Sequence, residues 1–193
     1  MQYGRVLLVA GVLLAGCATT PKTVEVLEVS PQEAVDRQAE VAQQAGGFVA
    51  VGMGSSLTLP LAQDKAIRRA RQALADAVQE RVAKLQAQYL DTAGASDPEF
   101  IEDWFAGVSR YLRDLIVGGA RPVVEKSQID EGLSTVWVLM VEDPGTIVQA
   151  MEMHGVSNRQ LYELVRGSAA YRALLADAER FGSYRRNLDR SRF

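Results

Sequence analysis

The chain contains a single cysteine, Cys17, and a single histidine, His154. A cysteine sulfur can act as a nucleophile, form a disulfide or bind a metal ion. Without a second cysteine the chain forms no internal disulfide, and one histidine is too few for a zinc site of the usual kind. The sequence on the N-terminal side of Cys17 is therefore the main guide to the role of this cysteine.

The residues before Cys17 have the pattern of an export signal. One positive charge, Arg5, precedes the apolar run Val6–Leu14, and small residues follow that run. A transmembrane helix needs roughly 20 apolar residues, about twice this run, and the stretch Thr19–Lys22 ends it. An ordinary secretory signal is the alternative, but it would leave Cys17 as an unpaired thiol in an oxidising compartment.

The four residues Leu14-Ala15-Gly16-Cys17 resemble the bacterial lipobox, the motif at which a lipoprotein signal peptidase cuts. The resemblance implies a cut between Gly16 and Cys17, after which Cys17 carries a diacylglyceryl thioether and an acylated amine, with fatty acids such as palmitate. Three such chains hold a protein on a membrane almost permanently, because each buried CH₂ contributes about 0.8 kcal/mol. Ala18, in place of the Asp that retains lipoproteins at the inner membrane, implies the periplasmic face of the cell outer membrane.

The composition fits one ordinary domain behind this leader. The 193 residues carry a formal net charge of −3, which becomes −4 when Arg5 is lost with residues 1–16. A mildly acidic chain is a poor partner for nucleic acid. The alternating stretch 23–29 could be an edge strand as well as part of a tether. We expect a signal peptide at 1–16, the lipidated Cys17 and a tether at 17–30, an α+β domain at 31–142, and a C-terminal helical extension with a basic tail at 143–193.

Helix and strand signals follow one another along the rest of the chain. Ser30 and Pro31 mark the start of a helix that Gly46-Gly47 ends. Asp130-Glu131-Gly132 marks a hairpin turn, and Pro122 places the first arm at a sheet edge. The expected helices are 31–45, 61–90, 96–117, 145–154 and 157–181, and the expected strands are 48–53, 123–129 and 133–141. They predict an α+β fold in which a small antiparallel sheet of about three strands is packed by a long helix, with additional helices around it.

The two longest helices each have an apolar face. A row of alanines in the helix 61–90 would let that helix approach a sheet closely. We expect this row to pack on the chain's own sheet, and a subunit interface is the alternative for Ala66, Ala70, Ala73 and Ala77. Aromatic residues in the helix 96–117 are more typical of a core than of a ligand pocket. Its expected buried side consists of Phe100, Ile101, Trp104, Phe105, Val108, Tyr111, Leu112 and Leu115.

Three blocks between residues 46 and 142 resemble the LPP-twenty family of bacterial lipoproteins. These blocks are the strand end Val51-Gly52-Met53-Gly54, the helix segment Ala66-x₃-Ala70-Arg71-x₂-Leu74-Ala75, and the hairpin around Val136–Leu139. The resemblance implies a long helix on an antiparallel sheet, and an outer-membrane-tethered protein that self-assembles and takes part in motility or envelope integrity. It carries no catalytic motif. The long helix from Asp97 and the extension 143–193 depart from the shortest members of the family.

Other motifs favour structural roles. Gly52-Met53-Gly54 lacks the third glycine of a dinucleotide loop, because Leu57 stands there, so we expect the two glycines to let the strand end bend or the backbone pack closely. His154 lies beside Gly155 at an expected helix C-terminus, where an imidazolium is mildly favoured. The acidic residues Asp97, Glu99, Glu102 and Asp103 could serve glycosidase chemistry, but they are also expected near a helix N-terminus.

The C-terminal residues are basic. We expect the tail 184–193 to fray, and Gly167-Ser168 to weaken the helix before it. Contact with anionic lipid headgroups or with peptidoglycan carboxylates is the functional alternative. The residues concerned are Arg180, Tyr184, Arg185, Arg186, Arg190, Arg192 and Phe193.

The sequence therefore predicts a lipid-anchored, non-enzymatic envelope protein of structural or assembly type. Its partners would be the membrane, through the N-terminal lipid, and a second copy or another envelope protein. One alternative is a tethered module that binds a ligand or a lipid in the cleft between the long helices and the sheet. A cell-wall hydrolase is least favoured, because His154 is the only histidine. No cofactor or metal is predicted.

Overall fold

The computed structural model describes residues 29–93 and 98–190 of the chain. It confirms the expected α+β class, since three antiparallel strands in the order β1-β3-β2 are packed by a long helix. The elements are α1 (Pro31–Gln44), β1 (Phe48–Ser56), α2 (Leu59–Ala93), α3 (Pro98–Gly119), β2 (Val124–Asp130), β3 (Leu133–Glu142), α4 (Gly145–Gly155), α5 (Arg159–Arg166) and α6 (Ala169–Arg190).

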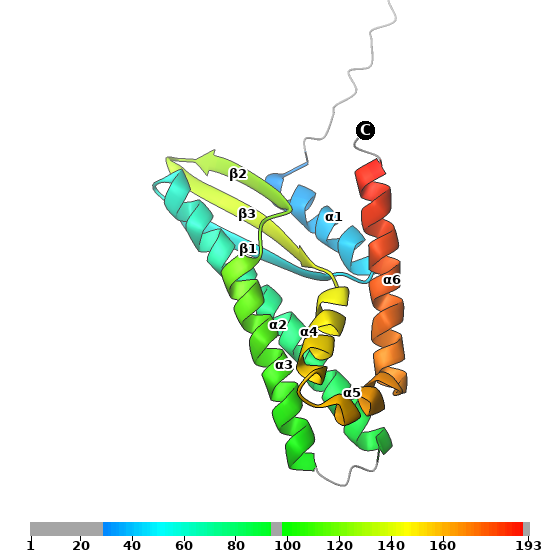
Figure 1. Ribbon diagram of the computed structural model, residues 1–193. Coiled ribbons are helices and arrows are strands. Elements are labelled where there is room, and N and C mark those ends of the chain that lie inside the picture. The colour runs from blue at the N-terminus through cyan, green and yellow to red at the C-terminus, as the bar shows by residue number, and fades with distance from the viewer. Residues whose placement is uncertain (1–28, 94–97, 191–193) are drawn as a thin grey trace, which may run out of the picture.

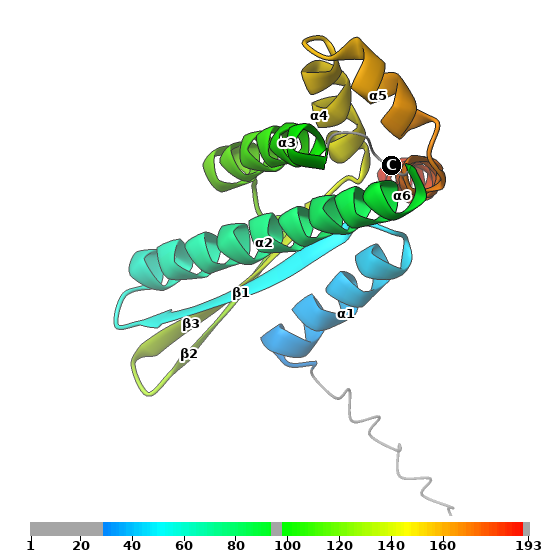
Figure 2. The ribbon, with the colours of Figure 1, turned by 90° about the horizontal axis from the view of Figure 1, so that it is seen from below.

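The sheet lies between two helices. Helix α2 covers one face over the whole length of β1, and the shorter α1 lies across the opposite face (Figures 1 and 2). Helices α3 and α4 lie on the far side of α2 from the sheet (Figure 2). Side chains of α4, α5 and α6 join the same hydrophobic core as those of α2 and the sheet, so the C-terminal extension packs as part of this one body.

Local signals set the start of α1 and the hairpin turn as expected. The Ser30 Oγ accepts a hydrogen bond from the Glu33 backbone N–H at 3.2 Å, and Pro31 is the first helical residue. In the turn between β2 and β3, Glu131 and Gly132 have φ angles of 47° and 81°. Two consecutive positive φ angles are characteristic of the tight hairpin turn whose twist matches the flanking strands.

Small residues bring α2 close to β1. Gly52 and Gly54 face α2, where a Cβ atom on either would lie within 3.0 Å of the α2 backbone at Ala66 or Ala62. Ala66 itself is fully buried. The close-packing interpretation of the two glycines is therefore confirmed, and the strand runs on to Ser56 rather than ending at residue 53.

The buried face of α3 differs from the expected one at Phe100, Leu115 and Ile116. Phe100 and Leu115 are 48% and 44% exposed, whereas Ile116, which was not expected to be buried, is 1% exposed. The buried residues of α3, from Ile101 to Ile116, are spaced mostly three and four apart, so they form one face of the helix. This face contacts α2 and α4, and Leu115 lies outside it. Trp104 and Phe105 are buried as predicted, and their rings meet edge to face at 5.0 Å.

The C-terminal region is more helical than expected. The predicted weak point at Gly167-Ser168 separates two helices, because α5 ends at Arg166 and α6 begins at Ala169. At the start of α6, the Ser168 Oγ accepts a hydrogen bond of 3.1 Å from the Tyr171 backbone N–H. The prediction that the tail frays from residue 184 is wrong as far as Arg190, because α6 continues to that residue. Residues 191–193 lie outside the described part. Phe181, buried against Gly47, and Tyr184, with its ring 5.7 Å from that of Phe181, anchor these turns.

Both faces of β3 are covered over only part of the strand. The residues facing α2, such as Val138 and Met140, are fully buried. On the other face Leu139 is 2% exposed, but Trp137 is only partly buried. The difference arises because α1 is short and crosses only one end of the sheet (Figure 2).

Candidate functional site

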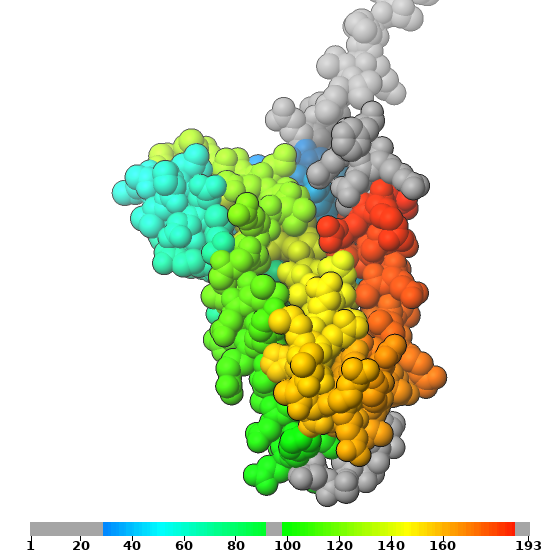
Figure 3. All heavy atoms as spheres, viewed as in Figure 1, coloured from blue at the N-terminus to red at the C-terminus, as the bar shows by residue number. Residues whose placement is uncertain are grey.

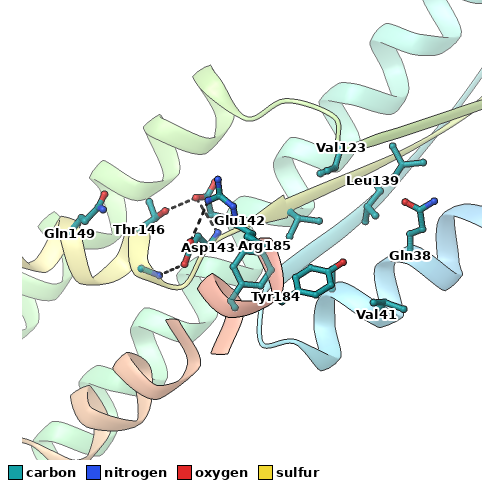
Figure 4. Close-up of a pocket in the computed structure, with 15 residues that line it drawn as sticks. Gln38, Val41, Val123, Leu139, Glu142, Asp143, Thr146, Gln149, Tyr184 and Arg185 are labelled. Carbon is teal, nitrogen blue, oxygen red and sulfur yellow. Dashed lines mark hydrogen bonds and ion pairs between the residues drawn. The ribbon is translucent and has the colours of Figure 1, made fainter. Parts of the chain in front are cut away.

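A cleft of about 780 Å³ lies on the side of the sheet opposite α2 (Figure 4). It is formed by α1, the start of β2, the end of β3 with the first turn of α4, and the last turns of α6. These segments are far apart in the sequence, so only the tertiary fold brings them together. The volume lies within the range of about 300–1,000 Å³ that is typical of small-molecule sites.

One end of the cleft is apolar. Leu139 and Val141 of β3 line it, with Val41 of α1 and Val123, just before β2, to either side (Figure 4). Leu139 is buried, whereas Val41 is 51% exposed and Val123 is 54% exposed. Large apolar side chains that stay half-exposed over a buried floor are the kind of surface that a ligand can cover.

The other end is polar and is built around the N-terminus of α4. The Glu142 Oε1 accepts a hydrogen bond of 2.5 Å from the Thr146 hydroxyl, and the Asp143 Oδ1 accepts one of 2.8 Å from the Gly145 backbone N–H. The Asp143 Oδ2 lies 3.5 Å from an Arg185 guanidinium nitrogen of α6. Carboxylates are favoured at a helix N-terminus, which explains why two of them are tolerated side by side here.

The negative charges of the cleft outnumber the positive charges and are less exposed. Two carboxylates, of Glu142 and Asp143, face a single guanidinium, that of Arg185. The Asp143 side chain is 26% exposed, whereas that of Arg185 is 62% exposed. The negative charge therefore lies deeper than the positive charge. Among the described residues that line the cleft none is a cysteine, serine, histidine or lysine.

The cleft does not lie where the ligand-binding alternative placed it. That alternative used a cleft between the long helices and the sheet, but the contact of Gly52 and Gly54 with α2 closes that interface. The cleft occupies the opposite face, at the end where α1 and α6 approach the sheet (Figure 4). A sequence pattern could not show this, because the position depends on where α6 packs.

The alanines in the row on α2 differ in their exposure to solvent. Ala66 and Ala70 are fully buried under the chain's own sheet, as we expected in preference to a subunit interface. Ala73 is exposed and Ala77 is partly exposed. The four residues therefore do not form one free surface, and a second subunit could contact only the last two while the sheet stays in place.

His154 occupies a structural position. It lies in the last turn of α4, where its Nδ1 lies 3.1 Å from the Ala150 carbonyl oxygen and its ring meets that of Tyr111 at 5.7 Å. Its ring also lies next to Gly107 of α3. His154 is not among the residues that line the cleft.

The acidic cluster and the basic tail are at the surface where the structure describes them. Glu99, Glu102 and Asp103 are exposed on α3, and Asp97 lies outside the described residues. In the tail, Arg180 pairs with Asp177 at 3.4 Å, and the Arg186 Nη2 donates a hydrogen bond of 2.9 Å to the Ser183 Oγ. Arg192 and Phe193 lie outside the described residues, and no side-chain position is described for Arg190.

The lipidation motif also lies outside the described residues, so Gly16, Cys17 and Ala18 have no described geometry. Within residues 29–93 and 98–190, no helix has the length and apolar character needed to cross a membrane. The same residues contain no group of three His, Cys, Asp or Glu side chains that could hold a metal ion.

The fold and the cleft together define a small α+β protein with an amphipathic cleft at one end of its sheet. No protein-family model, no curated protein and no solved structure matches the chain. The resemblance to LPP-twenty lipoproteins therefore stays a prediction from the sequence.

Proposed function

We propose that this chain is a lipid-anchored, non-enzymatic protein of the bacterial envelope, held at the periplasmic face of the outer membrane by acyl chains on Cys17. The observation that carries the proposal is the motif Leu14-Ala15-Gly16-Cys17 behind a short apolar run. Of the tether expected at 17–30, residues 18–28 would lie between the lipidated cysteine and Val29. Eleven residues reach at most about 40 Å, which keeps the body close to the membrane surface.

The arrangement of the two ends supports this proposal. The start of α1 and the C-terminal end of α6 lie at the same end of the molecule (Figures 1 and 3). A tether entering at α1 would therefore bring the end of α6 towards the membrane. Arg185 and Arg186, both exposed there, could then meet anionic headgroups, which attract basic residues by about 1 kcal/mol each near the surface.

A second candidate function concerns what the anchored body does. The cleft favours a tethered ligand-binding module, because it has a suitable volume, an apolar floor and convergent polar groups. Self-assembly remains a proposal that rests on the family resemblance. Only Ala73 and Ala77 of the alanine row could contribute to a subunit interface, since Ala66 and Ala70 already contact the sheet.

Fractionation of cells that make the full chain tests the anchor. The unaltered protein is expected in the outer-membrane fraction, and Cys17→Ser is expected to leave it. Thr20→Ala is a matched control, because it changes a neighbouring residue outside the four-residue motif. A Cys17→Ser variant that stays in the outer-membrane fraction contradicts the proposal.

A further inference from the structure

The cleft has the polarity of a site for an amphiphile. Its floor and one end are mainly aliphatic, with Gln38 beside Leu139 and Val41, and its charged groups gather away from that end (Figure 4). A molecule that buried a hydrocarbon chain between Val41 and Val123 would bring its head group towards Glu142 and Asp143. Burial of those two half-exposed valines supplies the hydrophobic driving force for binding.

The head group is selected by charge. The two carboxylates outnumber the one guanidinium, so the polar end has a net negative charge. Asp143 is already paired with Arg185, whereas no hydrogen bond to the Glu142 Oε2 is found within the described residues. An anionic head group that reached Arg185 from inside the cleft would also approach both carboxylates, and like charges at short range oppose each other.

We propose that the cleft binds a single-chain amphiphile with a primary ammonium head group, taken up as a free molecule. The chain lies over Leu139 between Val41 and Val123, and the ammonium donates hydrogen bonds to the carboxylates of Glu142 and Asp143. This inference rests on the proposed ligand-binding function. It does not depend on the lipid anchor, which is tested separately by fractionation.

The experiment measures binding by calorimetry, below the concentration at which each probe aggregates. The protein is the chain from residue 18 onward, which contains every residue of the described core; its cooperative unfolding is checked first. Three probes share a twelve-carbon chain and differ in their heads: dodecylammonium, dodecanol and dodecanoate. Dodecylammonium should bind at least tenfold more tightly than dodecanoate. Decylammonium should bind about fifteenfold more weakly than dodecylammonium, because it lacks two methylenes and each buried methylene is worth about a fourfold change in affinity.

Two pairs of variants test the contributions of the head group and of the hydrocarbon chain separately. Glu142→Gln keeps an oxygen that can accept the Thr146 hydrogen bond but removes the charge. It should therefore weaken the binding of dodecylammonium about tenfold and leave the binding of dodecanol unchanged. Glu179→Gln, an exposed residue of α6 outside the cleft, is the control for charge. Val41→Trp should abolish binding of all three probes by filling the apolar end. Glu40→Trp, on the same helix outside the cleft, should not.

Three results would overturn the proposal. Equal or tighter binding of dodecanoate would mean that Arg185 selects the head group. Absence of binding by every probe in the cooperatively folded protein would mean that the cleft takes no amphiphile of this kind. A dimer in solution that dissociates with Val41→Trp and not with Glu40→Trp would mean that a second copy of the chain covers the cleft.

Discussion

Gly52 of β1 lies directly against the backbone of Ala66 in α2, so close that a Cβ atom on Gly52 would come within 3.0 Å of the Ala66 carbonyl oxygen. The contact joins the one long helix to the sheet without an intervening side chain. Because the neighbour is helix backbone, it cannot turn aside as a flexible side chain would. The close approach of α2 to the sheet therefore requires that Gly52, like Gly54, has no Cβ atom.

Gly52→Ala is expected to destabilise the protein by about 3 kcal/mol, since overpacking against a fixed backbone forces α2 away from the sheet. The free energy of unfolding from urea titration measures this. Gly118→Ala is the matched control, because no atom lies within 4 Å of the position of its new Cβ. It should be neutral or stabilising by up to about 1 kcal/mol. Equal stability of the two variants would contradict the packing described here.

Alkaline pH should destabilise the protein through Tyr171. Burial, followed by the 3.2 Å hydrogen bond with the Tyr162 hydroxyl, raises the pKa of the Tyr171 hydroxyl above its ordinary value of 10. The folded state then holds this proton more tightly than the unfolded state does. The resulting stability is complete below pH 10 and is lost as pH rises from about 10 towards the folded-state pKa, by up to about 1.4 kcal/mol per pH unit.

Urea titrations between pH 8 and pH 11 test this expectation. Tyr171→Phe should reduce the alkaline loss of stability. Some loss should remain in this variant, because burial also raises the pKa of Tyr89. An alkaline loss that is the same with and without the Tyr171 hydroxyl would show that another group is responsible.

The ion pair between Arg81 of α2 and Asp177 of α6 should stabilise the docking of the C-terminal helix. Its atoms are 3.1 Å apart, and the two side chains are less than one-third exposed. A double-mutant cycle with Arg81→Ala and Asp177→Ala should give a coupling of about 1 kcal/mol that falls with added salt. The exposed pair Arg68–Asp64 should give only about 0.3–0.5 kcal/mol. Similar couplings for the two pairs would contradict this assignment.

Much of the fold could be predicted because its signals are local. Ser30 and Pro31 start α1 where expected, and the positive φ of Gly132 makes the turn that the hairpin requires. The alanine row on α2 also correctly indicated a close approach to the sheet. In each case the deciding interaction is formed by neighbouring residues or by one repeating pattern.

The exceptions depend on contacts between distant segments. The tail remains helical because Phe181 packs on Gly47, more than a hundred residues earlier in the chain. The cleft exists because that packing brings α6 beside α1 and places Arg185 next to Asp143. The charges at the start of α4 could have been noticed in the sequence as Glu142-Asp143-Pro144, but nothing local pairs them with residues of α1 or α6.

We propose that a lipid on Cys17 places this protein at a membrane. Mass spectrometry of the mature protein purified from a membrane fraction can detect that lipid. We expect an N-terminal peptide that begins at Cys17, with a diacylglyceryl group on sulfur and an acyl group on nitrogen. A free thiol at Cys17, or a chain that still begins at Met1, would show that the proposal is wrong.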